Sequence, residues 1–132
     1  MTFARLIAST AFALTLTACG GGPIELVGEY TTSFAFDESI TEETWGTTSI
    51  EDYDNDANWA VTRNPADAMF GADLYLKQVW TEPKADGSFH YCIVDFNLPT
   101  LEAAQTSTQT ADASDPDNSG CGGFGWTGMT RK

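Results

Sequence analysis

The sequence predicts an all-β domain, a small antiparallel barrel or sandwich of about seven strands with one short helix before the last strand. Three observations carry this prediction. Short segments that alternate apolar and polar residues recur along the chain, and they are rich in Thr, Ile and aromatic residues. Turn residues separate these segments at intervals of roughly 8–12 residues. The sequence contains no heptad pattern and no internal repeat.

The N-terminal half is predicted to hold four strands. The first alternates aromatic residues with small or polar ones, and the next two are rich in Thr and Ile, which suit a pleated surface. Asn64-Pro65 ends the fourth strand, because proline cannot donate to a ladder. The predicted strands are residues 25–36, 39–45, 47–53 and 59–63, with turns at Asp37-Glu38, at Gly46 and over residues 52–58.

The C-terminal half is predicted to contain a hairpin, a short helix and a last strand. The hairpin joins residues 74–81 and 88–96 through Asp86-Gly87, and its second strand is apolar on both faces, which is typical of a central strand. Thr100 is the expected N-cap of a helix over residues 99–107. Residues 108–120 are polar and predict a solvated loop. The last strand includes Phe124, Trp126 and Met129.

The N-terminus reads as a processing signal. One cation, Arg5, precedes an apolar run over residues 6–18 that has the length of a signal-peptide core and is too short to span a bilayer. Leu16-Thr17-Ala18-Cys19 resembles the lipobox of bacterial lipoproteins. The resemblance implies cleavage after Ala18 and lipid on Cys19, and therefore a membrane partner. It divides the chain into a signal peptide (1–18), a Gly-rich tether (19–24) and an acidic β domain (25–132).

The same resemblance implies a location and a disulfide. Gly20, rather than Asp, follows Cys19, which in this class implies sorting to the outer membrane of the cell envelope. If Cys19 takes lipid, Cys92 and Cys121 remain as an even pair in an oxidising compartment, and we expect them to form a disulfide. Two free thiols, or two metal ligands, are the alternatives.

The charge of the chain narrows the choice of partners. The 132 residues carry 19 acidic and six basic side chains, a net charge of −13, which becomes −14 (five basic against 19 acidic) if Arg5 leaves with the signal peptide. This balance argues against nucleic acid, which needs basic patches to displace counterions. It fits a solvated acidic surface, a bound cation or a basic protein partner.

Two further resemblances concern the domain itself. Leu26-Val27-Gly28-Glu29-Tyr30 is similar to the Gly-x-Trp opening of lipocalin-like barrels, with Tyr30 in place of Trp. Tyr91-Cys92, followed by Asp115-Pro116 and by a Gly-rich segment from Cys121 to Trp126, resembles the ending of small β-rich bacterial lipoproteins. The first implies a ligand carrier, and the second brings no activity with it.

Candidate metal and catalytic residues are few. Asp52, Asp54, Asp56 and Asn58 place oxygen atoms at alternate positions, as at the start of a calcium loop, although Ala57 and Arg63 stand where such a loop needs Gly and Glu. A plain acidic turn is the favoured interpretation, so no cofactor is predicted except calcium as an alternative. His90 is the only histidine and is expected to be structural or at the surface, because the sequence offers it no nucleophile.

The aromatic residues are predicted to build the core, and the alternative is that a few line a groove for a ligand. The set is Tyr30, Phe34, Trp45, Trp59, Trp80, Phe89, Tyr91 and Trp126. Because no catalytic motif is present, we expect a non-enzymatic, membrane-anchored lipoprotein that binds a partner or serves the envelope structurally. The alternatives are a lipocalin-like carrier of a small apolar ligand and an inhibitor of a basic protein such as a lysozyme.

Overall fold

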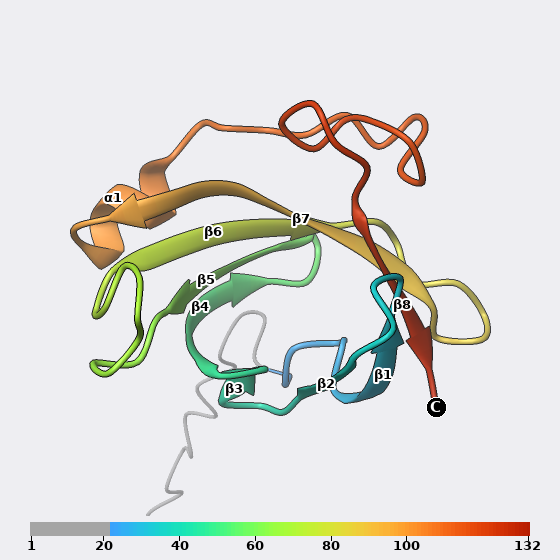
Figure 1. Cartoon of the computed structure of the whole chain (residues 1–132), viewed down its shortest axis with the longest axis horizontal. Coiled ribbons are helices and arrows are strands. Elements are labelled where there is room, and N and C mark those ends of the chain that lie inside the picture. The colour runs from blue at the N-terminus through green and yellow to red at the C-terminus, as the bar shows by residue number, and fades with distance from the viewer. Residues whose placement is uncertain (1–21) are drawn as a thin grey trace, which may run out of the picture.

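The structure is a computed structural model that describes residues 22–132, so Cys19 and the lipobox lie outside the described residues. Eight antiparallel strands follow one another around a closed barrel, and β8 pairs with β1 to close it (Figure 1). The predicted all-β fold is confirmed, and it takes the form of a barrel. The elements are β1 (Gly28–Thr32), β2 (Asp37–Ile40), β3 (Thr44–Trp45), β4 (Thr48–Asp54), β5 (Trp59–Arg63), β6 (Tyr75–Trp80), β7 (Phe89–Leu98), α1 (Leu101–Thr106) and β8 (Thr127–Arg131).

The first predicted strand is much shorter than expected. Only Gly28–Thr32 forms β1, and the chain turns at residues 33–36, where Ala35 has φ +61°. The Thr32 hydroxyl accepts hydrogen bonds from the backbone N–H groups of Phe34 and Phe36 and stabilises this turn. The predicted turn at Asp37-Glu38 is therefore wrong, because both residues belong to β2 and pair with β1.

The predicted strand over residues 39–45 is divided in two, which raises the number of strands from seven to eight. The Thr41 side chain accepts hydrogen bonds from the N–H groups of Glu43 and Thr44, and this local turn separates β2 from β3. Such short side-chain-to-backbone bonds compete with a continuous ladder. The strand predicted at residues 59–63 is confirmed as β5.

The short helix before the last strand is also confirmed. Thr100 caps α1 by accepting a hydrogen bond from the Ala103 N–H at 3.1 Å. Lys77 on the outer face of β6 holds the other end of the helix, because its ammonium donates to the carbonyl groups of Gln105 (3.3 Å) and Ser107 (2.7 Å). Among residues 22–132, no helix is long and apolar enough to cross a membrane.

The two ends of the barrel differ because the chain enters at one of them. Along an up-and-down barrel, successive connections alternate between the ends. The end that carries the β2–β3, β4–β5 and β6–β7 connections also receives residues 22–27, and we call it the closed end. There Ile24 and Leu26 are each 1% exposed and pack into the core. Ile24 thus belongs to the packed interior, although the sequence analysis places it in the tether.

Hydrogen bonds fix this entering segment to the strands around it. The Trp80 indole N–H donates to the Glu25 carboxylate at 2.8 Å, and the Tyr30 hydroxyl donates to the Leu26 carbonyl at 2.7 Å. The Tyr53 hydroxyl reaches the Gly22 carbonyl at 2.7 Å. The closed end is therefore filled by both apolar packing and satisfied polar groups.

Most of the predicted aromatic core is confirmed. Tyr30, Trp45, Trp80 and Phe89 are buried and pack in one cluster, in which the rings of Trp45 and Trp80 lie 6.2 Å apart. Three members of the predicted set lie outside this cluster. Phe34, in the β1–β2 turn, is 69% exposed, Trp59 lies under the ammonium of the outer-face residue Lys77, and Trp126 is buried elsewhere. This cluster fills the middle of the barrel, between the closed end and the opposite end.

Candidate functional site

Exposed phenylalanines gather at the end of the barrel opposite the entering segment, which we call the open end. It carries the β1–β2 turn (33–36), the β3–β4 turn, the β5–β6 connection (64–74) and the long β7–β8 connection (99–126). Of the six phenylalanines in residues 22–132, only Phe89 is buried, and the other five lie on these connections or on the adjoining half of β7. They are Phe34, Phe36, Phe70, Phe96 and Phe124.

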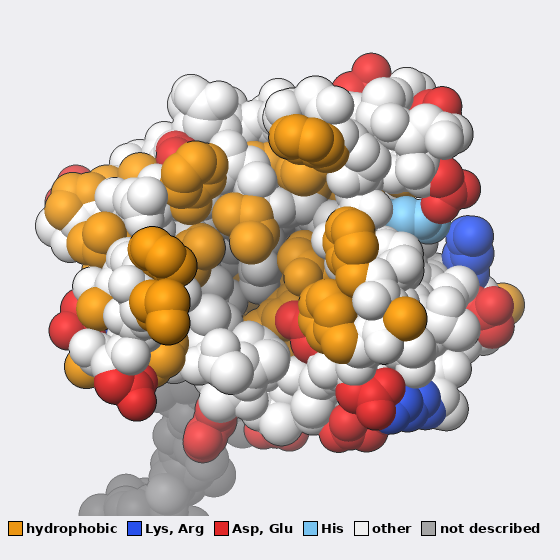
Figure 2. Space-filling view, viewed as in Figure 1, with side chains coloured by type: hydrophobic (Ala, Val, Ile, Leu, Met, Phe, Trp, Pro, Cys, Tyr) orange, Lys and Arg blue, Asp and Glu red, His pale blue; other side chains and the backbone are white. Residues whose placement is uncertain are grey.

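These side chains surround a hollow. Figure 2 shows hydrophobic groups gathered around a depression in the face of the molecule, with acidic groups mostly at its outer edge. A groove of about 660 Å³ lies here between the inner face of β6 and β7 and the two long connections, within the size range of small-molecule sites. Its apolar lining is Phe70, Leu76, Ile93, Phe96 and Phe124, and Asn64 and Asn97 supply polar groups.

A bulge in β7 places Phe96 in this lining. The pairing of β6 with β7 shifts register between Ile93 and Asp95, so strict alternation fails beyond Ile93. Strict alternation would set Phe96 on the face opposite Ile93, and the bulge removes that expectation. Both side chains line the groove, which makes the adjoining half of β7 one of its walls.

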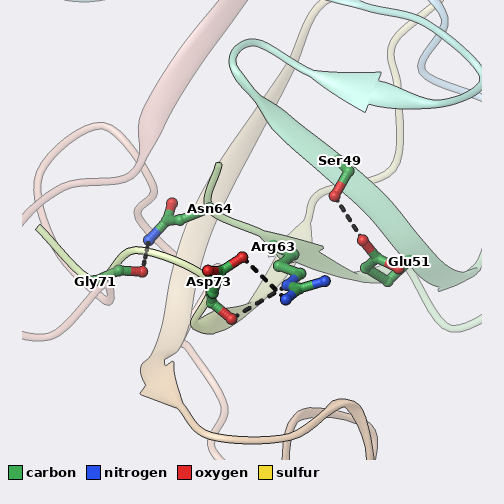
Figure 3. A network of polar contacts seen from close by, with 6 residues as sticks. All are labelled: Ser49, Glu51, Arg63, Asn64, Gly71 and Asp73. Carbon is green, nitrogen blue, oxygen red and sulfur yellow. Dashed lines mark hydrogen bonds and ion pairs between the residues drawn. The ribbon is translucent and has the colours of Figure 1, made fainter. Parts of the chain in front are cut away.

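The β5–β6 connection is held in place by polar contacts, drawn in Figure 3. The Arg63 guanidinium binds the Asp73 carboxylate at 3.0 Å and donates to the Asp73 carbonyl at 3.2 Å. The Asn64 amide donates to the Gly71 carbonyl at 3.0 Å. Gly71 has φ +61°, and a Cβ there would lie 2.7 Å from the Asn97 amide oxygen. Glycine at this position therefore lets the connection approach β7 and present Phe70.

The disulfide holds the β7–β8 connection against the barrel. Cys92 on β7 is bonded to Cys121, as predicted, with a sequence separation of 29 residues. The Trp126 indole N–H donates to the Asp112 carbonyl at 3.0 Å, and the two ends of the turn from Cys121 to Phe124 are joined by backbone hydrogen bonds. Phe124, which was predicted to lie in the last strand, instead lies on this turn, 78% exposed, beside the groove.

Glu38 is the carboxylate that faces the interior below this rim. It shares the inward face of β2 with Ile40, which is 1% exposed, and the Tyr91 hydroxyl donates to Glu38 Oε2 at 3.5 Å across the barrel. Gly46, at φ +56°, leaves room for it, because a Cβ there would lie 3.2 Å from Glu38 Oε1. Among the described residues, no Lys, Arg or His side chain forms an ion pair with Glu38.

The surroundings of Glu38 change two acid–base equilibria. Burial raises the pKa of the Glu38 carboxyl, an effect that the Trp45 indole N–H and the Tyr91 hydroxyl partly offset. Trp45 Nε1 is nevertheless buried without a well-aligned hydrogen bond. Burial, together with the charge of Glu38, raises the pKa of the Tyr91 hydroxyl to about 12. The rings of Trp45 and Tyr91 lie 5.1 Å apart at this point.

The four calcium candidates lie on β4 and in the turn after it, and two of their carboxylates serve other contacts. The Asp52 carboxylate accepts a hydrogen bond from the Gln105 amide at 2.7 Å, and the Asp54 carboxylate accepts from the N–H groups of Asp56 and Ala57. Asn58 has φ +55° and lies in the turn between β4 and β5. In the part of the chain from residue 22 onward, no three His, Cys, Asp or Glu side chains are arranged to hold a metal ion. Calcium binding stays a prediction.

His90 has a partner that the sequence does not reveal. Its Nε2 lies 2.8 Å from the Asp117 carboxylate, which comes from the β7–β8 connection. The disulfide brings Asp117 to β7, so the pairing depends on a contact across 27 residues. Asp117 is 79% exposed, which makes this a polar contact at the surface rather than a buried catalytic pair.

Sequence reasoning missed most of the residues that form the open end. Phe36, Phe70, Phe96 and Phe124 were absent from the predicted aromatic set or assigned to strands, and Glu38 was placed in a turn. The one available signal is Phe70, which lies outside every predicted strand beside Gly71 and between Asp67 and Asp73. Comparison with protein-family models, with curated proteins and with solved structures finds no match for this chain.

Proposed function

We propose that this domain is a non-catalytic binding protein that takes a small, largely apolar ligand at the open end of its barrel. The observation that carries the proposal is the groove of about 660 Å³, whose lining comes from β6, β7 and both long connections. Exposed aromatic side chains are otherwise unfavourable on a protein surface, and their concentration around one hollow is typical of a binding site.

The closed end supports the same proposal. Ile24 and Leu26 fill that end, and the buried aromatic cluster fills the space above them, so a ligand has access from the open end. The described chain also begins at the closed end, where Gly22 is bound by Tyr53. Lipid on Cys19, at the outer membrane of the cell envelope, would therefore hold the closed end toward the bilayer and leave the groove facing away from it.

Fluorescence titration with N-phenyl-1-naphthylamine, an uncharged apolar probe, tests ligand binding. We expect a saturable rise in fluorescence with the wild-type domain, and roughly tenfold weaker binding by Phe70→Ala, a loss of about 1.4 kcal/mol. Met69→Ala is the matched control, since Met69 is 87% exposed beside Phe70 but does not line the groove. The absence of saturable binding, or equal losses in the two variants, would contradict the proposal.

Lipid anchoring has its own test. Mass spectrometry of the protein from the membrane fraction is expected to find a diacylated cysteine, formerly residue 19, at the N-terminus, and Cys19→Ser is expected to leave an uncleaved and unacylated chain. A mature protein that keeps residues 1–18 would contradict this part of the proposal without affecting the ligand-binding part.

A further inference from the structure

Glu38 is an inward-facing carboxylate in an otherwise apolar and aromatic surrounding. In contrast, its neighbour Asp37 faces outward and is paired with Lys132 at 2.6 Å. Burying an ionisable group without an opposite charge is unfavourable, so a half-buried carboxylate without a cation is expected to serve a purpose other than stability. No basic side chain of the described residues meets it.

One wall of the groove, on β7, leads toward this carboxylate. On β7, Tyr91 lies one inward position deeper than Ile93, which lines the groove, and its hydroxyl contacts Glu38. Glu38 and Phe36, two positions before it, are not part of the groove lining, so a ligand would reach Glu38 beyond Ile93. An extended molecule in the groove can therefore place one end near Glu38 while its body stays among Phe70, Ile93 and Phe96.

We propose that the ligand is a cationic amphiphile, an apolar molecule with an ammonium group that Glu38 binds beside the rings of Trp45 and Tyr91. A carboxylate next to aromatic faces is the combination that recognises ammonium groups, because both attract a cation. The net charge of −13 acts in the same direction by attracting cations to the domain. This inference rests on the proposed function, since it identifies the ligand class of the same groove.

Two buried hydrogen-bond donors favour a different ligand, one that carries a carboxylate. Gln78 Nε2 is buried without a hydrogen-bond partner and Trp45 Nε1 without a well-aligned one, and such donors would suit a ligand carboxylate. Glu38 opposes that choice, because two carboxylates at one site repel each other. The comparison of amine and carboxylate ligands therefore decides which polar group controls selectivity.

The experiment measures the affinities of decylamine, decanol and decanoate by tryptophan fluorescence at neutral pH. We expect decylamine to bind about tenfold more tightly than decanol and decanoate to bind most weakly. Glu38→Gln should reduce decylamine affinity to that of decanol and leave decanol affinity within about twofold. Glu29→Gln is the matched control, because it removes the same charge from the outer face of β1, where Glu29 accepts a hydrogen bond from Ser39 at 2.6 Å.

Each outcome separates the inference from the proposed function. Equal affinities for decylamine and decanol, tighter binding of decanoate, or equal losses in Glu38→Gln and Glu29→Gln would overturn the inference while leaving an apolar ligand site. Failure of all three compounds to bind would overturn both. Circular dichroism and thermal unfolding verify that the variants fold.

A second measurement needs no variant. The permanently charged decyltrimethylammonium ion should bind the wild-type domain less tightly as Glu38 takes up a proton in acid. The other titratable groups packed near Glu38 are Tyr91 from β7 and Tyr30 from β1, and both remain neutral between about pH 4 and pH 8, because burial raises the pKa of each hydroxyl. Affinity that is constant with pH in this range would contradict the role of Glu38.

Discussion

The two ends of this barrel are made by the same strands but by different chemistry. At the closed end, Ile24 and Leu26 are buried, and Tyr30, Tyr53 and Trp80 donate hydrogen bonds to the entering segment. At the open end, five phenylalanines are exposed, and within residues 22–132 no basic side chain pairs with the inward-facing Glu38. The connections differ as well, because the two longest, over residues 64–74 and 99–126, both lie at the open end.

This contrast separates stability from function. A buried apolar side chain stabilises the fold in proportion to the area it removes from water, whereas an exposed one contributes little and is available to a ligand. The closed end therefore has the features of a core, and the open end has the features of a binding site. Substitutions at the closed end are expected to lower the free energy of unfolding, and substitutions at the open end are expected to weaken ligand binding.

The largest expected effect comes from truncating the closed end. Leu26→Ala should lower the free energy of unfolding by about 3–5 kcal/mol, because Leu26 is 1% exposed and the barrel around it cannot collapse onto the cavity. Phe124→Ala at the open end should change it by no more than about 0.5 kcal/mol, since that ring is 78% exposed. Urea unfolding measures both, and similar losses in the two variants would abolish the distinction between the ends.

The disulfide links the open end to the stability of the whole domain. Replacing Cys92 and Cys121 by Ser should lower the free energy of unfolding by about 3–4 kcal/mol, because the bond closes a loop over a separation of 29 residues. It should also weaken binding of the apolar probe, since the turn from Cys121 to Phe124 forms part of the groove. Reduction of the wild-type protein is the control and should give the same loss; an unchanged unfolding curve would contradict the expectation.

The sequence predicts the closed end better than the open end, for a physical reason. Trp45, Trp80 and Phe89 alternate with polar residues in strands, and this alternation is sufficient to assign them to a core. Phe34 and Phe36 show the same alternation but lie in a turn, because whether an aromatic residue is buried depends on which strands close the barrel above it. Local pattern contains no information about that closure.

Glu38 illustrates the same limit for a polar residue. Asp37-Glu38 interrupts an apolar run, which predicts a turn, yet pairing with Thr31 and Tyr30 places both residues in a strand. The inward direction of Glu38 depends on its pairing with β1, and the Tyr91 hydroxyl that contacts it comes from β7, which is distant in sequence. The disulfide, in contrast, was predictable because counting cysteines requires no knowledge of the fold.

Tyr91 connects the two ends and supplies the smallest of the three stability effects. It pairs with Trp80, whose indole binds the entering segment, while its own hydroxyl contacts Glu38. Because its pKa is about 12 in the folded domain and about 10 in an unfolded chain, the folded state keeps its proton longer as pH rises. The contribution of the protonated Tyr91 hydroxyl to the free energy of unfolding is fully present below about pH 10. It is lost as pH rises to about 12, which lowers the free energy of unfolding by roughly 2–3 kcal/mol.

Two variants identify the source of that alkaline loss. Tyr91→Phe keeps a ring 5.1 Å from that of Trp45 but has no proton to release, so it should lose less stability between about pH 10 and pH 12 than the wild type. Glu38→Gln should also reduce the loss, because the charge of Glu38 is one cause of the raised Tyr91 pKa. Urea unfolding across this range, followed with tyrosinate absorbance, measures both effects. If Tyr91→Phe loses as much stability as the wild type, Tyr91 is not the residue that couples the two ends.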